Sequence, residues 1–515
     1  MNFKNVLKVS GFTLISRFLG LLRDILLSRF FGASSLSDAF FVAFKIPNLF
    51  RRLFAEGSMQ AAFVPIFAKV LGEDEKKARE FASQVFTIFF IILAIFVCLF
   101  DYYADYVIMV ISPGIKSRGD EIFNLTVELL RITMPYLLFI SMVSFYSSLL
   151  NSLNKFSLVA FLPALLNISI VATLLLSDVD SNIFQSAAHA GSWGIFWGGL
   201  AQLLCVMWAC YKNKWLIRFT LIKKVMVETK TFFRRILPVV FGAGVYQVNI
   251  IVDVLVASLL PAGAISFLFY ADRIYQLPLA IIGIAIGTVV LPEISGSNKT
   301  HEEKADIKQN ALIFSLGMSL FAAISLIVFA NETIKIIFYG GNFSLEATRI
   351  TAIVLMIYTL SLPANIITKV ILPFYYSYGD TRTPFYSTLV CLLLNLVLVF
   401  SLANFFGVYG IACATVIAST VNLLILFFVL YKKYNFRLSE KFYIEFKKII
   451  IVAMLLIFML LLIKHAFLDN LTLDLFWFRF IYIFCIILMV VFVIFLLRLV
   501  KSYIYFEVMK LFSRN

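Results

Sequence analysis

Long apolar stretches alternate with short polar segments along almost the whole chain. The hydrocarbon core of a bilayer is crossed by about 20 apolar residues of helix, and each stretch approaches or exceeds that length. The first two stretches are the least hydrophobic, so hydropathy alone is expected to miss one of them. The pattern predicts an all-α polytopic membrane protein with fourteen transmembrane helices, near 7–30, 35–55, 82–110, 122–150, 157–177, 187–211, 236–260, 264–294, 310–330, 348–378, 385–404, 407–431, 446–466 and 477–499.

Basic residues are concentrated in some of the loops between these stretches. The loop at 212–235 carries eight Lys and Arg residues and the loop at 432–448 carries six, whereas 178–186, 261–263 and 405–406 carry none. Lys and Arg mark cytoplasmic loops, so both termini are predicted to be cytoplasmic. The net charge of +15 then reflects loops that face anionic lipid headgroups, and nucleic acid is not an expected partner.

Composition excludes several classes of protein. The chain is 62% hydrophobic and 14% charged, against about 25% charged residues in soluble domains. No Gly-Lys pair occurs, which excludes a P-loop ATPase. The six cysteines lie in apolar runs without a CxxC pair, so neither a metal site nor a disulfide framework is predicted. The predicted outer loops are too short for the catalytic segments of a sugar-transferring enzyme. We therefore expect a non-enzyme without cofactor or metal.

An internal repeat spaces related segments 228 positions apart. The segment 43–46 resembles 271–274, and the dipeptide at 166–167 recurs at 394–395. Six predicted helices separate the copies, so both copies cross the membrane in the same direction. The repeat predicts two parallel six-helix lobes around a central cavity lined by helices 1, 2, 7 and 8. The predicted parts are 1–228 (N-lobe, helices 1–6), 229–440 (C-lobe, helices 7–12) and 441–515 (two extra helices, 13 and 14).

Ionisable residues within the predicted spans gather where the two lobes are expected to meet. Each costs about 2.5–3.5 kcal/mol to insert, so each requires a partner or a role. Basic residues outnumber acidic ones, and the planar guanidinium of Arg binds phosphate bidentately. Arg–Asp pairs that hold the lobes together are the alternative, and the pair at 51–52 is also explained by its cytoplasmic position. The candidate residues are Arg17, Arg23, Asp24, Asp38, Arg51, Arg52, Asp272 and Arg273.

Helical geometry constrains how these charges meet. Arg17, Gly20 and Asp24 share one helix face, whereas Arg23 is rotated by about 120° from Arg17. A kink near Gly20 or a neighbouring helix must therefore bring Arg23 to the same site. Lys369 stands alone in its span and is interpreted as an ordinary paired or snorkelling side chain.

Several motifs resemble those of one family, the MurJ (MviN) lipid II flippases. The resemblance spans the whole chain in length and helix count. It implies the fold of the multidrug/oligosaccharidyl-lipid/polysaccharide exporter superfamily. It also implies transport of lipid II from the cytoplasmic to the outer leaflet of the bacterial inner membrane. The motifs are SRFLGLLRD at 16–24, DAFFVAFKIPNLFRRLFAEG at 38–57, AFVPIFA at 62–68, YADRIYQLP at 270–278 and GTVVLP at 287–292.

The resemblance also implies roles for particular residues. Helices 13 and 14 would form a groove for the polyprenyl tail of the substrate. Gln276 departs from the pattern, since some relatives have Glu there. Some relatives are proposed to bind sodium, and Val399 stands where a second carboxylate of that site would be expected. The implied essential arginines are Arg17, Arg23, Arg51 and Arg273 with Asp38 as an associated acid, and the possible monovalent-cation site is Asp253, Asn395 and Thr415.

Three other functions remain open. A drug/cation antiporter of the same fold is disfavoured because its cationic substrates do not match an excess of Arg. An O-antigen or polysaccharide-lipid flippase would also require basic residues, and only the motifs distinguish it. A membrane enzyme of wall synthesis is disfavoured by the short outer loops. The expected partners are lipid II and membrane lipids.

Overall fold

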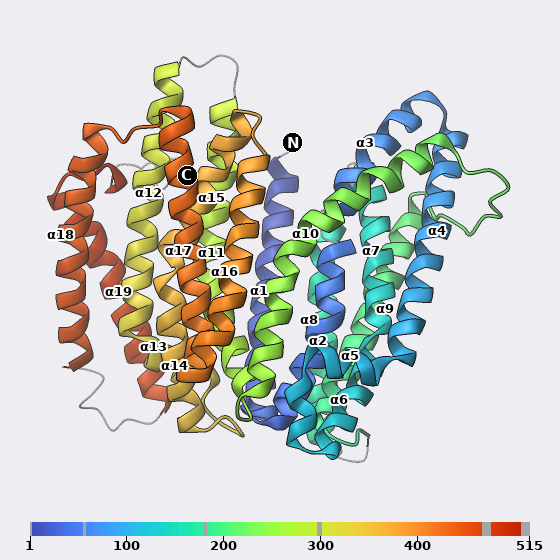
Figure 1. Ribbon diagram of the computed structural model, residues 1–515, viewed down its shortest axis with the longest axis horizontal. Coiled ribbons are helices and arrows are strands. Elements are labelled where there is room, and N and C mark those ends of the chain that lie inside the picture. Colours follow the sequence, from blue (N-terminus) through green and yellow to red (C-terminus); the bar gives the residue numbers. More distant parts are fainter. Residues whose placement is uncertain are drawn as a thin grey trace. The chain divides into compact units, whose positions relative to one another are not determined.

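Helices joined by short turns make up nearly all of the chain in this computed structural model, which describes residues 3–54, 58–153, 155, 157–179, 183–295, 301–465 and 475–505 (Figure 1). The helices are α1 Phe3–Phe31, α2 Ser35–Phe54, α3 Ser58–Glu73, α4 Glu75–Tyr102, α5 Ala104–Ile111, the 3-10 helix η1 Pro113–Arg118, α6 Asp120–Thr133, α7 Pro135–Ser152, α8 Ser157–Val179, α9 Ala187–Lys212, α10 Val227–Leu259, α11 Ala264–Ser295, α12 His301–Val328, α13 Ala330–Phe338, α14 Leu345–Leu360, α15 Leu362–Ser377, α16 Arg382–Phe406, α17 Val408–Tyr434, α18 Glu440–Ile463 and α19 Leu475–Leu499.

Ten helical segments of the described chain are long and apolar enough to cross a membrane. They coincide with ten of the predicted spans. Two more predicted spans, 236–260 and 477–499, contain the shorter apolar helices Gln247–Leu259 and Cys485–Leu499. Neither α1 nor α2 is among these segments, and α2 carries the charged side chains Asp38, Lys45, Arg51 and Arg52 within an apolar run. The all-helical membrane class is confirmed, and the count of fourteen stays a prediction.

Two predicted spans consist of two helices each, broken at proline. Pro135 begins α7 directly after α6, and Pro363 lies in the first turn of α15 directly after α14. Proline has no backbone N–H and interrupts a continuous helix, but it is well accommodated in a first turn. Pro135 and Pro363 are separated by the same 228 positions that separate Asp38 from Ser266. The repeat in the sequence is therefore matched by a repeat in where helices break.

The chain divides into two compact units. Unit 1 consists of residues 1–266 and 340–344, and unit 2 consists of residues 267–339 and 345–515. Both the start of α11 and the short segment after α13 thus belong to unit 1. The lobe boundaries predicted near 228 and 440 stay a prediction.

The core of unit 1 is aromatic where α3, α4, α7 and α10 meet. Phe63 of α3 is completely buried, with its ring 5.5 Å from that of Phe81, 5.2 Å from Phe145 and 6.2 Å from Phe232. Burying such a side chain contributes about 1.5–3 kcal/mol. Elsewhere in this unit α8 packs between α1 and α9. This packing holds α1, which carries three of the predicted site residues.

In unit 2, α12 packs against both α15 and α18. Its core includes Ile313 of α12 and Ile449, Val452 and Leu456 of α18, all fully buried. α16 and α17 form a close pair around Gly410, where a β carbon would stand 2.2 Å from the carbonyl oxygen of Leu402. Only glycine permits that approach.

Candidate functional site

The predicted arginines of α1 have opposite environments. Arg23 is 7% exposed, and its Nε and Nη2 donate to Asp24 Oδ1 at 2.9 and 2.7 Å. Its Nη1 donates to Asn167 Oδ1 of α8 at 2.9 Å. Arg17 is exposed and makes no hydrogen bond or ion pair within the described part of the chain. Of the two, Arg17 is the cation that is available to a ligand.

Asn167 joins α8 to two points on α1. Its Nδ2 donates to the carbonyl of Ser16 at 3.0 Å, and the same nitrogen would lie 3.4 Å from a β carbon at Gly20. Asn167 of α8 therefore orients Arg23, and the expectation that Arg23 reaches the same site as Arg17 stays a prediction. The sequence pointed to Asn167 only as part of the repeat, and an amide in an apolar span was the signal for its role.

Asp38 of α2 is completely buried and accepts four hydrogen bonds. The backbone N–H groups of Gly263 and Ser266 donate at 2.8 and 2.9 Å, and the hydroxyl of Ser266 donates at 2.6 Å. Arg118 Nη1 completes the set at 2.7 Å. Four bonds fill the acceptor capacity of a carboxylate. Asp38 thus caps the N-terminus of α11, where the helix dipole favours negative charge.

Arg118 of η1 was not among the predicted residues. Besides Asp38, its guanidinium donates from Nη2 to the carbonyls of Ser258, Leu260 and Pro261 at 3.2, 2.8 and 3.4 Å. These carbonyls lie at and just after the C-terminal end of α10, where the helix dipole favours a cation. At the turn between α10 and α11, Arg118 therefore binds the C-terminal end of α10 and Asp38 binds the N-terminal end of α11. Arg118 ends the short helix η1, between two of the predicted spans, where the sequence offered no signal.

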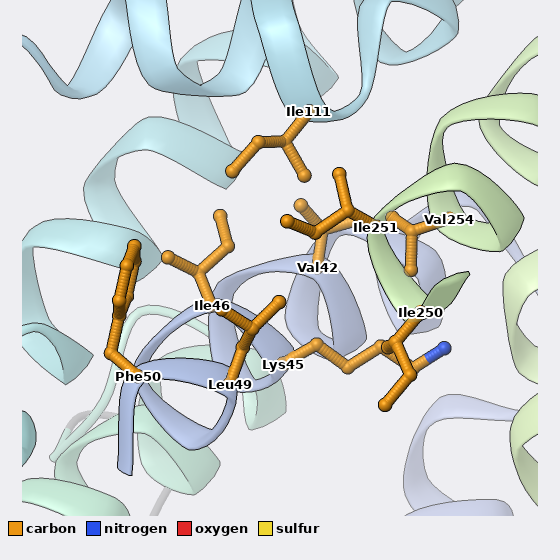
Figure 2. A pocket seen from close by; sticks show the side chains of 9 residues that line it. All are labelled: Val42, Lys45, Ile46, Leu49, Phe50, Ile111, Ile250, Ile251 and Val254. Atoms are coloured by element: carbon orange, nitrogen blue, oxygen red, sulfur yellow. The ribbon is translucent and has the colours of Figure 1, made fainter. Parts of the chain in front are cut away.

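The remaining basic residues of α2 lie along its second half. Arg51 is half-buried, and its Nε donates to Asn48 Oδ1 at 3.1 Å. Arg52 is half-buried and has no hydrogen bond or ion pair to any described residue. Lys45 lies at a small open cavity of unit 1 (Figure 2). The other residues that line the cavity are apolar: Val42, Ile46, Leu49, Phe50, Ile111, Ile250, Ile251 and Val254.

This cavity is not the predicted site. Within unit 1 it contains none of the predicted arginines, and Lys45 is its one cationic group. Its volume is about 20 Å³, against about 300–1,000 Å³ for sites that hold a small-molecule ligand. The wall is suited to apolar groups rather than to a charged headgroup.

In unit 2, the predicted site residues Asp272 and Arg273 of α11 are half-buried. The polar side chain of Gln276 lies one helical turn after Asp272. Gln276 donates to Asp272 Oδ2, and the Arg273 guanidinium lies 4.5 Å from the centre of the Phe269 ring. The amide of Gln276 is thus a direct hydrogen-bond partner of the predicted site residue Asp272. That Arg273 lines the same cavity as the predicted site residues of unit 1 stays a prediction.

Lys369 of α15 extends across Gly283 of α11. A β carbon at Gly283 would come within 2.9 Å of Lys369 Cδ, so glycine lets this side chain lie against the helix. Lys369 is exposed and has no ion pair among the described residues. The interpretation of Lys369 as a paired side chain is not supported, and a second available cation lies in unit 2.

The possible cation ligands are divided between the units. Asp253 lies half-buried on α10 of unit 1, and Asn395 and Thr415 lie on the paired helices α16 and α17 of unit 2. The Thr415 hydroxyl donates to the carbonyl of Ile411 in its own helix at 3.2 Å. Val399 is fully buried one turn after Asn395. Within the searched residues, no cluster of three His, Cys, Asp or Glu side chains is present.

Comparison with known proteins identifies the family. The model of the family described as "Lipid II flippase MurJ" matches residues 27–484. The chain belongs to the MurJ family. It is 32% identical to a protein of Rickettsia prowazekii named "Probable lipid II flippase MurJ", over 91% of this chain and 92% of that protein. It is 33% identical to the "Lipid II flippase MurJ" of Burkholderia cenocepacia, over 84% of each chain.

Solved structures agree with this assignment. A MurJ structure in an inward closed conformation aligns with a TM-score of 0.79 and 28% identity, over 95% of this chain and 98% of that one. An inward-facing multidrug transporter of the MATE family aligns with a TM-score of 0.68 at 14% identity, over 84% of this chain and 98% of that one. The second likeness shows the shared exporter fold alone. The MurJ family is thus supported by sequence and by structure over nearly the whole chain.

Proposed function

We propose that this chain moves lipid II from the cytoplasmic to the outer leaflet of the bacterial inner membrane by alternating access, without catalysing a chemical reaction. The supporting observation is Arg17 of α1, an exposed guanidinium in the same helix as Arg23, which is already paired with Asp24. A guanidinium held in this way is suited to the pyrophosphate of the substrate. Both termini are then cytoplasmic, and lipid II and the surrounding lipids are the partners.

Complementation tests this function. In a bacterium depleted of its own flippase, the chain should restore growth and lower the lipid II retained in the inner leaflet. Arg17→Ala should abolish both effects at normal membrane levels. Arg382→Ala is the matched control, since Arg382 is exposed at the start of α16, outside the predicted site, with no partner among the described residues.

An O-antigen flippase is distinguished in the same strain background. If this chain restores export of O-antigen lipid but leaves lipid II inside, the substrate assignment is wrong. Retention of both lipids in the inner leaflet would contradict flippase activity altogether.

The energy for transport is proposed to come from the membrane potential. The pyrophosphate carries about two negative charges, and moving them outward through 100 mV releases about 4.6 kcal/mol. An empty carrier rich in arginine also resets in the favourable direction. The rival proposal is a monovalent cation bound at Asp253, Asn395 and Thr415, whose gradient would drive the cycle.

A further inference from the structure

A loop with an unusual composition connects α9 to α10 in unit 1. Its residues, 213–226, read NKWLIRFTLIKKVM and include basic and apolar side chains but no acid. We name this segment the interfacial loop. The substrate site does not involve it, and its combination of charge and exposed apolar surface requires an explanation.

Both ends of the interfacial loop are fixed to the first turns of α4. Arg79 Nη2 donates to the carbonyl of Lys214 at 2.7 Å. Near the other end, the Gln84 side chain donates to the carbonyl of Lys224 at 3.1 Å and accepts from the N–H of Met226 at 3.0 Å. The loop is thus held in one place.

The middle of the loop reaches further along α4. The N–H of Thr220 donates to Thr87 Oγ1 at 3.1 Å, and the ring of Phe219 lies 5.0 Å from those of both Phe86 and Phe90. From Arg79 to Phe90 the helix rises by about 16 Å. Since α4 is charged at Glu75–Glu80 and apolar from Phe86 onward, the loop descends from the polar part of α4 to its apolar part.

The side chains of the loop also change from basic to apolar towards its tip. At its tip Leu221 is 93% exposed and Phe219 is 60% exposed. On either side of the tip Arg218, Lys223 and Lys224 are exposed as well. An apolar tip with basic neighbours is the pattern of segments that lie in the membrane interface. Basic residues at that depth attract the anionic lipids of the cytoplasmic leaflet.

We propose that the interfacial loop inserts Phe219 and Leu221 among the acyl chains of the cytoplasmic leaflet and binds the phosphates of anionic phospholipids through Arg218, Lys223 and Lys224. The negative charge of the leaflet complements the positive charge of the loop. Because Phe219 packs against Phe90, the position of Phe90 along α4 sets how deep the tip lies in the membrane. The loop is an anchor that fixes unit 1 at the membrane surface. This role is independent of which lipid the protein transports.

The depth of the tip tests the insertion. An environment-sensitive dye is attached at L221C in a full-length chain whose six native cysteines are replaced by alanine. The chain is placed in nanodiscs of phosphatidylcholine, or of phosphatidylcholine mixed with phosphatidylglycerol. Dye emission should indicate an apolar environment, more strongly in the mixed membrane. Emission typical of water in both membranes would overturn the proposal and indicate a surface for a cytoplasmic protein.

The proposed binding of lipid phosphates by Arg218, Lys223 and Lys224 is tested by measuring which lipids the purified protein retains. The native cysteines are kept in this experiment. Native mass spectrometry should find phosphatidylglycerol retained over phosphatidylcholine by the unmodified chain. Each basic residue near an anionic surface is worth about fivefold in affinity. The variant R218Q/K223Q/K224Q should therefore lower that preference by about tenfold or more. Its matched control is K432Q/R437Q/K447Q, which removes three exposed charges from other cytoplasmic segments. An equal loss in the control would overturn the assignment to this loop.

Discussion

Asp38 and Ser266 stand 228 positions apart and hydrogen bond to each other, with the Ser266 hydroxyl 2.6 Å from the Asp38 carboxylate. This separation equals the spacing of the sequence repeat. The two residues are therefore equivalent positions of the two copies, in contact with each other. An acid at position 266 would repel the carboxylate of Asp38. The second copy of the repeat therefore has a serine where the first copy has an aspartate.

The pair of Arg118 with Asp38 should dominate the stability of this turn. Removing Arg118 leaves a buried carboxylate without its cation, which costs roughly 3–5 kcal/mol. Arg118→Ala should thus lower the melting temperature of the purified protein strongly. Arg131→Ala is the control, because Arg131 and Asp105 are half exposed and 3.6 Å apart, and such pairs contribute about 0–1 kcal/mol. Equal melting temperatures for the two variants would contradict the role of Arg118.

Arg17 and Arg23 should separate activity from stability. Arg17→Ala removes an unpaired guanidinium, so growth should be lost while the melting temperature is unchanged. Arg17→Lys should be poorly tolerated too, because an ammonium lacks the planar fork. Arg23→Ala removes the hydrogen bonds that Arg23 donates to Asp24 and Asn167, and a lost charge-assisted bond costs about 1.5–3 kcal/mol. Both growth and melting temperature should fall in that variant. Normal growth with Arg17→Ala would refute the assignment to pyrophosphate.

Asp380, between α15 and α16, should make stability depend on pH. Burial would raise the pKa of Asp380, but bonds from Thr383, Tyr434 and Lys433 outweigh it and hold the pKa below the ordinary 3.8. A lowered pKa stabilises the fold above the unfolded value, and this contribution is lost as the pH falls below about 4 towards the folded value. Asp380→Asn should therefore flatten the acid side of the melting-temperature profile. An unchanged slope would show that Asp380 does not titrate as described.

Collapsing the membrane potential distinguishes the two energy sources. Valinomycin with potassium removes the potential while sodium and proton gradients persist, and lipid II transport in vesicles should then stop. Asp253→Asn should retain transport under an intact potential. Transport that survives valinomycin but ends without sodium, or in Asp253→Asn, would favour cation coupling.

The fold was predictable because a bilayer imposes a simple rule on sequence. An apolar run of sufficient length must be a spanning helix, and the ten confirmed segments follow from that rule. α2 is not among these segments, because Asp38, Lys45, Arg51 and Arg52 lower its mean hydropathy. A mean hydropathy does not show that Asp38 is paired with Arg118 in the folded chain.

The candidate site was predictable only in part. The excess of arginine and the motifs pointed to Arg17 and Arg23 before any geometry was available. The additional bond from Arg23 to Asn167 joins residues that are 144 positions apart. Arg118 of η1 binds Asp38, which is 80 positions away in the sequence. Contacts at such separations are set by packing, and one sequence does not reveal them.

The capping of α11 by Asp38 has a consequence for biosynthesis. The Gly263 N–H that binds this carboxylate lies 225 positions downstream, so it leaves the ribosome long after Asp38. At about 5–20 residues per second, the delay is roughly 11–45 s. Arg118 is translated earlier, only 80 positions after Asp38. During translation Arg118 is thus the first of these partners to reach the buried acid, and it shields the charge until the second half of the chain arrives.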